Sequence, residues 1–355
     1  MLRIRITPAL GERAYAYAKA CGVIGKSFIG KRMYCLENVN RLSELDKTVF
    51  PGASVNLPEK ELLLNLEDRI IDRAVNSIIG VAKCFSRPPE FLTLLIRGYE
   101  YEDLKNALFA LQTKDKSAPV HTDIGRFQTV CFKAWPDIEA MLKGTDFEFL
   151  LKDILKNRDS PPEIISLQTA LDKRYYSALW KSLLSLPAKD RRVSEKILAD
   201  EISLKNSGWA LRLRTYYKMP EDEVKRHMID LPLKGNKPRM RKSAFRSLAD
   251  DALASLEFPL DSFAGWSCWR WRRFLNPEPE GSPWTADPRH FQNAASRYLY
   301  RLARHFFHLR PFSLDFIFCF IKLKQFEEDF LTSQAEGLGM GMSGMDIVSM
   351  LGVKA

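Results

Sequence analysis

Residues 167–187, LQTALDKRYYSALWKSLLSLP, decide the fold class of this chain. Six apolar side chains in this stretch recur at spacings of three and four residues, the period that gathers them on one side of an α-helix. They are Leu167, Leu171, Tyr175, Leu179, Leu183 and Leu186. Asp172, Lys173 and Lys181 fall on the other faces. The stretch therefore predicts an amphipathic helix with one buried stripe, which Pro187 ends.

The same apolar pattern occurs once before and once after this stretch. The earlier copy contains Leu66, Ile70, Ala74, Ile78, Val81 and Phe85, and the later copy contains Phe291, Ala295, Leu299, Leu302, Phe306 and Leu309. Pro88 follows the earlier copy and Pro311 follows the later one, as Pro187 follows the middle one. Because proline ends a helix or opens the next one at its first turn, each copy predicts a helix–break–helix hairpin.

The second helices of these hairpins share a further signature. The sequences YEDLKN at 101–106 and EISLKN at 201–206 both end in Leu-Lys-Asn, and QFEEDF at 325–330 keeps only the acidic run. We therefore expect a threefold internal repeat with a period of roughly 100–125 residues, the size of a small helical domain. A chance alignment of three hairpins is the alternative, and the two copies with Leu-Lys-Asn are the firmer pair.

The repeat predicts an all-α fold of three similar helical-bundle domains, residues 1–118, 119–235 and 236–355. Polar connectors at 114–120 and 231–238 mark the two boundaries. The length of 355 residues leaves room for three such domains. A hydrophobic content of 46% excludes a mainly disordered chain, and 18 glycines are too few for a collagen-like one.

Net charge, cysteine content and targeting signals indicate the partners and the cellular compartment that we expect for this chain. It carries 54 Lys and Arg against 44 Asp and Glu, a net charge of +10 that favours an anionic partner. The six cysteines are scattered with no C-x-x-C pair, which predicts reduced thiols in a cytosolic protein. The charged N-terminus offers no signal-peptide core. The most apolar stretch, Pro311 to Ile321, is too short for a transmembrane segment.

Several short motifs resemble ligand sites but lie in the wrong context. Residues 339–344, GMGMSG, match the dinucleotide-binding G-x-G-x-x-G but follow a predicted helix, so we expect a turn into a short helix at 345–351. Residues 22–27, GVIGKS, lack the first glycine of a phosphate-binding loop. His305 and His308 share a helix face without a third metal ligand nearby.

The carboxylates Glu100, Glu102 and Asp103 cluster on a predicted helix beside basic residues, and we expect solvated ion pairs there. The sequence contains neither a G-x-S-x-G elbow nor an H-E-x-x-H pair. We therefore predict no catalytic residues, no cofactor and no metal, and hence a protein that is not itself an enzyme.

The run WSCWRWRR at 266–273 is the densest aromatic and basic segment. Arginines between indoles could stack on nucleic-acid bases or rest on lipid headgroups. A helix whose tryptophans enter the core while its arginines face water accounts for the run equally well. A basic helical nucleic-acid-binding protein is therefore the alternative functional hypothesis.

The middle repeat resembles a known family, the C-type subunits of the V/A-type (vacuolar/archaeal-type) rotary ATPases, related to the d-type subunit of the vacuolar enzyme. Residues 171–180, LDKRYYSALW, are similar to its LD-x-x-YY-x-x-LW helix, and EISLKN with ALRLR at 210–214 is similar to the helix after it. Residues 219–224, 99–108, 298–304 and 311–313 add weaker similarity. Asp329-Phe330, the glycine-rich 337–344 and the tryptophan-rich run depart from the family pattern.

This resemblance implies three similar domains around a pseudo-threefold axis, forming a funnel. It implies a non-catalytic rotor subunit, one copy per complex, which joins the D- and F-type subunits of the central axle to the proteolipid ring in the membrane. A protein in this position couples ATP hydrolysis or synthesis to ion translocation. It lies peripherally on the cytoplasmic side of the cell membrane, without nucleic acid as a partner.

Overall fold

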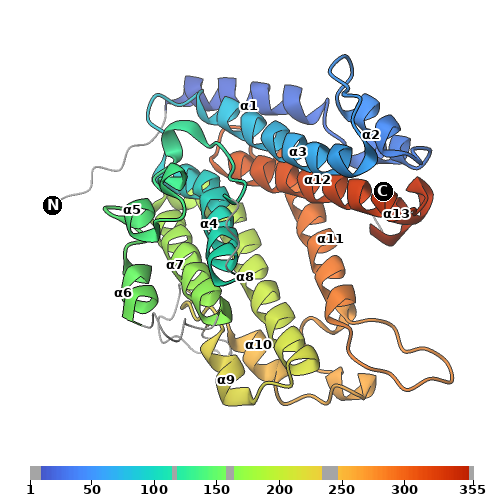
Figure 1. Ribbon diagram of the computed structural model, residues 1–355. Helices are drawn as coiled ribbons and strands as arrows, with labels where there is room; N and C mark the ends of the chain where they lie inside the picture. Colours follow the sequence, from blue (N-terminus) through green and yellow to red (C-terminus); the bar gives the residue numbers. More distant parts are fainter. Residues whose placement is uncertain (1–8, 114–117, 157–163, 234–246, 352–355) are drawn as a thin grey trace.

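The computed structural model describes residues 9–113, 118–156, 164–233 and 247–351 (Figure 1). Within these ranges the regular structure is helical, and the one β-type pairing is an isolated bridge between Pro232 and Ser247. The prediction of an all-α fold is therefore confirmed. The boundary predicted at 235/236 and most of both polar connectors lie outside the described residues, so the three domain ranges stay a prediction.

Three long hairpins form the frame of the molecule, as the apolar periods and prolines predicted. They are α3 (Glu59–Ala82) with α4 (Glu90–Gln112), α7 (Ile164–Ser185) with α8 (Ala188–Tyr216), and α11 (Pro288–Phe307) with α12 (Asp315–Gly339). Pro89, rather than Pro88, caps α4, and Pro187 caps α8. Each proline supplies the extended backbone that precedes a helix and lacks an N–H group that would go unpaired there.

Shorter elements surround the hairpins. Before them come α1 (Leu10–Ile24), the 3₁₀ turn η1 (Gly30–Leu36) and α2 (Leu42–Val49). Between them lie η2 (Gly125–Phe127), η3 (Phe132–Ala134), α5 (Ile138–Leu142), α6 (Phe149–Lys156), α9 (Glu221–Arg226), α10 (Asp250–Ser255), η4 (Phe263–Trp266) and η5 (Arg272–Phe274), and α13 (Gly344–Leu351) follows them. No helix of the described ranges combines the length and apolar character that crossing a bilayer requires.

The hairpins pack on one another in a cycle. The first helix of each hairpin lies against the second helix of another: α7 on α4, α11 on α8, and α3 on α12. Figure 1 shows the first and the last of these pairs side by side. Gly98 permits the close approach of α4 and α7, because a Cβ atom there would lie 2.9 Å from the Tyr175 hydroxyl. The largest cluster of buried apolar side chains draws on all three predicted domains. The hairpins therefore share a core.

Helix α1 joins the turns of all three hairpins. The Glu12 carboxylate accepts a hydrogen bond of 3.0 Å from the Ser86 backbone N–H, between α3 and α4. The Arg13 guanidinium pairs with Asp190 in the first turn of α8 at 2.6 Å, and it donates to the Phe312 carbonyl, between α11 and α12, at 3.1 Å. Two adjacent side chains of one helix thus hold the three turns together.

Candidate functional site

The repeated Leu-Lys-Asn motifs meet in space. Lys105 of α4 and Lys205 of α8 both bind the same Oδ1 atom of Asp172 on α7, at 2.8 and 3.2 Å. The Lys205 ammonium also lies 5.0 Å from the centre of the Tyr176 ring. The Asp172 side chain is 9% exposed, so its charge is stabilised by these two lysines rather than by water. The sequence signature of two repeats therefore forms one ionic bridge between three helices.

The third hairpin joins this bridge through α12. Lys322 pairs with Glu201 of α8 at 2.7 Å, and the Tyr176 hydroxyl donates to the same Glu201 oxygen at 3.2 Å. On the other side of α12, Glu328 accepts a hydrogen bond of 2.7 Å from the Tyr99 hydroxyl of α4. We call this set the polar belt: Tyr99, Lys105, Asp172, Tyr176, Glu201, Lys205, Lys322 and Glu328. It links all three hairpins.

The acidic run of the third hairpin divides among three environments. Glu327 is buried, where it pairs with Lys324 and accepts a hydrogen bond of 2.7 Å from the Phe28 backbone N–H. Glu328 belongs to the polar belt. Asp329 is exposed and has no hydrogen bond or ion pair with any described residue. The acidic run therefore anchors the segment after α1 through Glu327 and contributes Glu328 to the polar belt.

The polar belt is chemically suited to hold helices together rather than to catalyse a reaction. Asp172 and Glu201 are bound by lysines and Glu328 by a tyrosine hydroxyl, and none of these contacts supplies a nucleophile with an adjacent base. Burial raises the pKa of Tyr99 and Tyr176 well above the usual value of 10.0, so both hydroxyls remain protonated donors. The described residues contain no cluster of His, Cys, Asp and Glu able to hold a metal ion.

Glu328 makes the stability of the fold depend on pH. Burial raises its pKa from 4.5 to about 8, although the Tyr99 hydrogen bond acts in the opposite direction. The folded chain therefore keeps a proton that the unfolded chain releases, and stability falls as the pH rises from about 4.5 to about 8. Relative to wild type, Glu328→Gln should gain up to about 5 kcal/mol of unfolding free energy across this window. Urea unfolding from about pH 5 to about pH 9 measures the gain, and parallel profiles would contradict it.

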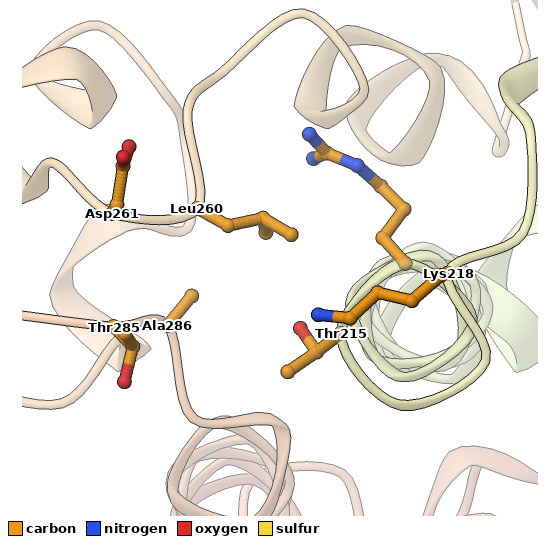
Figure 2. A pocket seen from close by; sticks show the side chains of 7 residues that line it. Thr215, Lys218, Leu260, Asp261, Thr285 and Ala286 are labelled. Carbon is orange, nitrogen blue, oxygen red and sulfur yellow. The ribbon is translucent and has the colours of Figure 1, made fainter.

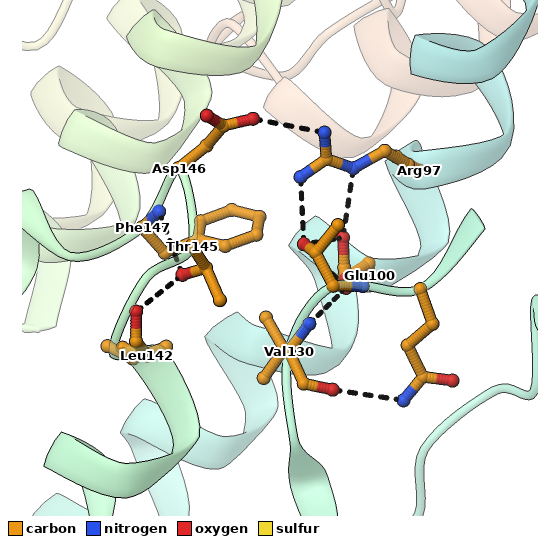
Figure 3. Close-up of polar contacts among 9 residues, drawn as sticks. Arg97, Glu100, Val130, Leu142, Thr145, Asp146 and Phe147 are labelled. Atoms are coloured by element: carbon orange, nitrogen blue, oxygen red, sulfur yellow. Dashed lines mark hydrogen bonds and ion pairs between the residues drawn. The ribbon is translucent and has the colours of Figure 1, made fainter. Parts of the chain in front are cut away.

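Glu100 is not a solvated carboxylate, so the prediction of solvated ion pairs for the group Glu100, Glu102 and Asp103 is wrong for this residue. Its side chain is fully buried and accepts hydrogen bonds from the backbone N–H groups of Thr129 and Val130, the latter at 2.6 Å (Figure 3). Arg97 donates to it at 3.1 Å and pairs with Asp146 at 3.0 Å (Figure 3). The network fixes the segment after η2 against α4. Periodicity could not reveal this, because Thr129 and Asp146 lie outside the helix.

The other two carboxylates of that group differ from each other. Asp103 is buried and accepts from the Thr122 backbone N–H at 2.8 Å, and burial raises its pKa to about 6. The prediction of a solvated ion pair is therefore wrong for Asp103 as well. Glu102 is 63% exposed and pairs with Lys105, three residues further along α4, which confirms that prediction for this residue.

A surface cavity of about 420 Å³ lies beside the C-terminal end of α8 (Figure 2). Its lining residues are Arg214, Thr215, Lys218, Leu260, Asp261, Thr285 and Ala286. The Arg214 guanidinium is engaged elsewhere, since it donates to the carbonyls of Ser255 and Phe258 at 2.7 and 2.9 Å. Asp261 lies across the cavity from Lys218. The lining shows no pairing of a nucleophile with a base.

The short ligand-like motifs occupy structural positions. Residues 339–344 form the turn between α12 and α13, as predicted, and Gly344 is close-packed because a Cβ atom there would lie 2.2 Å from the Val39 carbonyl oxygen. Gly22 lies within α1. His305 and His308 are exposed at the end of α11, and Nδ1 of His308 is hydrogen-bonded to the Tyr17 hydroxyl at 2.8 Å.

The tryptophan-rich run is part of the core. Trp266, Trp269 and Trp271 are at most 5% exposed, and the Trp271 indole N–H donates to Ser203 of α8 at 3.0 Å. Arg270 pairs with two carboxylates, Asp200 of α8 and Asp251 of α10. The run extends from the end of η4 through an irregular turn to η5 and does not form an α-helix. Buried indoles cannot stack on bases, so the observation that motivated the nucleic-acid hypothesis has a structural explanation.

Sequence reasoning missed the contacts that α1 makes. Nothing in the sequence marks Arg13 as different from the exposed arginines, and its partner Asp190 is 177 residues away. Tyr99 was part of a segment similar to the known family, but its hydrogen bond to Glu328 was not predicted. Both residues form contacts between hairpins, which a period within one helix does not report.

Sequence comparison relates this chain to known proteins. Residues 52–349 match the ATP synthase (C/AC39) subunit family. An uncharacterized protein of Treponema pallidum (strain Nichols) is 28% identical over 332 residues, which cover 92% of each chain. The match includes all three hairpins and confirms the resemblance inferred from the middle repeat. The chain therefore belongs to the ATP synthase (C/AC39) subunit family, which is related to the C-type and d-type subunits of the V/A-type ATPases.

Proposed function

We propose that this chain is the non-catalytic central-stalk subunit of a V/A-type rotary ATPase. In this role it joins the central axle to the rotor ring in the membrane, so that ATP hydrolysis or synthesis is coupled to ion translocation. The polar belt carries the proposal, because two partly buried ion-pair contacts and one tyrosine–carboxylate hydrogen bond tie each helix hairpin to the next. A part that transmits torque must resist shear between its helices, and closely packed interiors are stiff.

The cyclic packing of α3, α7 and α11 on the second helices supports a pseudo-threefold funnel as part of this proposal. Three similar domains would present equivalent surfaces to a symmetric ring on one side and to a single axle on the other. We propose D- and F-type axle subunits and the ring proteolipid as partners, with one copy of this chain per complex. The chain would lie peripherally on the cytoplasmic side of the membrane.

Isolation of the intact complex tests this function. A tagged chain purified from detergent-solubilised membranes should bring down the axle subunits and the ring proteolipid together with ATPase activity. Deletion of the gene should leave ATP hydrolysis in the head but abolish ATP-driven ion transport in membrane vesicles. Recovery of an assembled ATPase without this chain, or ion transport that persists after the deletion, would contradict the proposal.

A further inference from the structure

Helix α11 has an unusual charge composition. Residues 288–307 contain four arginines, two histidines and no acidic residue. The long helices α4, α8 and α12 carry both signs of charge, and several of their basic side chains are bound by carboxylates. The positive charge of α11 is therefore not balanced within the helix.

Three of these arginines lie in a row on the outer face. Arg297, Arg301 and Arg304 are spaced four and three residues apart, which places them along one side of the helix. Arg301 and Arg304 are exposed and Arg297 is half-buried. Leu299, Leu302 and Phe306 on the opposite side pack against the core. We call Arg297, Arg301 and Arg304 the arginine stripe, which spans about 10 Å along the helix axis.

The arginine stripe has no counter-charge in the part of the chain that the structure describes. Arg13, Arg97 and Arg270 each bind a carboxylate, whereas none of the three stripe guanidinium groups has an ion pair or a hydrogen bond there. Burial and the neighbouring charge of Arg301 both lower the pKa of Arg297. Two unpaired guanidinium groups one turn apart repel each other, so the stripe as it stands is electrostatically unfavourable.

A second basic segment adjoins the stripe. A Cβ atom built on Gly30 would lie 3.3 Å from Nη2 of Arg304, so the guanidinium group covers the start of η1. Lys31 and Arg32, the next two residues, extend this basic segment, and Lys31 is exposed. The positive surface therefore continues from α11 onto the N-terminal part of the chain, and segments far apart in the sequence build it together.

We propose that the arginine stripe binds an acidic face of a partner protein, with Asp or Glu side chains about one helical turn apart. Guanidinium groups match carboxylates in a bidentate geometry, and a single row of them matches carboxylates along a helix. A lipid surface is less well matched because α11 exposes no large apolar side chain for insertion. Nucleic acid is less well matched because the stripe has no exposed aromatic ring for stacking.

The proposal rests on the proposed function, because the ATPase complex is where the partner is sought. In the tagged complex, Arg301→Lys and Arg304→Lys keep the charge and add amines that a carbodiimide joins to carboxylates in ionic contact. We expect a cross-link from position 301 or 304 to an Asp or Glu of another subunit. Adding Arg297→Glu should lower its yield about tenfold, because like charges then face each other. Arg41→Lys, an exposed position at the start of α2, is the matched control and should give no such product.

The outcomes separate the two proposals. An assembled complex that shows no cross-link from positions 301 and 304 would overturn the proposal that the arginine stripe binds an acidic partner. It would leave the proposed function intact. Failure of the wild-type chain to bring down ATPase subunits would instead count against the function. The purified chain is also tested for binding to vesicles of phosphatidylglycerol and phosphatidylcholine and to single-stranded RNA. If it binds either one, and if Arg297→Glu with Arg301→Glu abolishes that binding, the proposal of an acidic protein partner is overturned.

Discussion

Replacing Arg13 by methionine is expected to lower the free energy of unfolding by about 3–5 kcal/mol, because it leaves Asp190 as an unpaired buried charge. The two side chains are 7% and 1% exposed, and their closest atoms are 2.6 Å apart. The same substitution removes the hydrogen bond from Arg13 to the Phe312 carbonyl. The turns of the second and third hairpins would then lose their common contact with α1. Chemical denaturation of the purified chain measures the loss.

A double substitution identifies the cause. Arg13→Met with Asp190→Leu removes both charges, so it should recover a large part of the stability that Arg13→Met alone loses. Lys26→Met, which removes an exposed cation shortly after α1, is the control and should change the unfolding free energy by less than about 0.5 kcal/mol. A double variant no more stable than Arg13→Met would show that the buried ion pair is not what holds α1 to the hairpins.

Replacing Trp271 by alanine is expected to cost about 3–5 kcal/mol of unfolding free energy, the usual range for deleting a large buried aromatic side chain. The indole is 2% exposed, stacks on Phe274 with ring centroids 5.4 Å apart, and donates a hydrogen bond to Ser203. Deletion would leave a cavity between the turn η5 and α8, and the Ser203 hydroxyl would lose its donor. Thermal and chemical unfolding both report this effect.

Arg273→Ala is the matched control for the tryptophan-rich run. Arg273 is exposed, and its guanidinium carbon lies 5.0 Å from the centre of the Phe274 ring. Its removal should cost no more than about 1 kcal/mol. If the run served nucleic acid instead, Arg273→Ala would weaken binding to single-stranded RNA at low salt, and Trp271→Ala would leave the stability of the fold nearly unchanged. The buried indole leads us to expect the reverse pattern.

The hairpins were predictable because their signals are local. The apolar side chains from Leu167 to Leu186 recur with the period of a helix, and Pro187 lies where one helix ends and the next begins. Both signals act over a few residues, so neither requires knowledge of the packing. The Leu-Lys-Asn motif indicated that two segments are related, but it did not show that Lys105 and Lys205 bind the same carboxylate.

The predictions from sequence that were wrong concern the environments of polar side chains and the local structure of the tryptophan-rich run. Glu100 and Asp103 looked like surface carboxylates because basic residues are close to them in sequence, yet Thr129 and Thr122 from a following segment bury them. A helix was one interpretation of the tryptophan-rich run, but its buried indoles come from η4 and from the turn that joins η4 to η5. In each case the deciding partner comes from another element.

The sequence by itself determined the helical class, the positions of the three hairpins and the family resemblance. Only the tertiary structure decided which helices are neighbours, which charges are buried and paired, and which, like Arg301, remain without a partner among the described residues. The physical reason is the distance along the chain over which each kind of interaction acts. Helix formation depends on backbone hydrogen bonds and side chains a few residues apart, whereas the energy of a charged side chain depends on every group that packs around it, such as Asp190 beside Arg13.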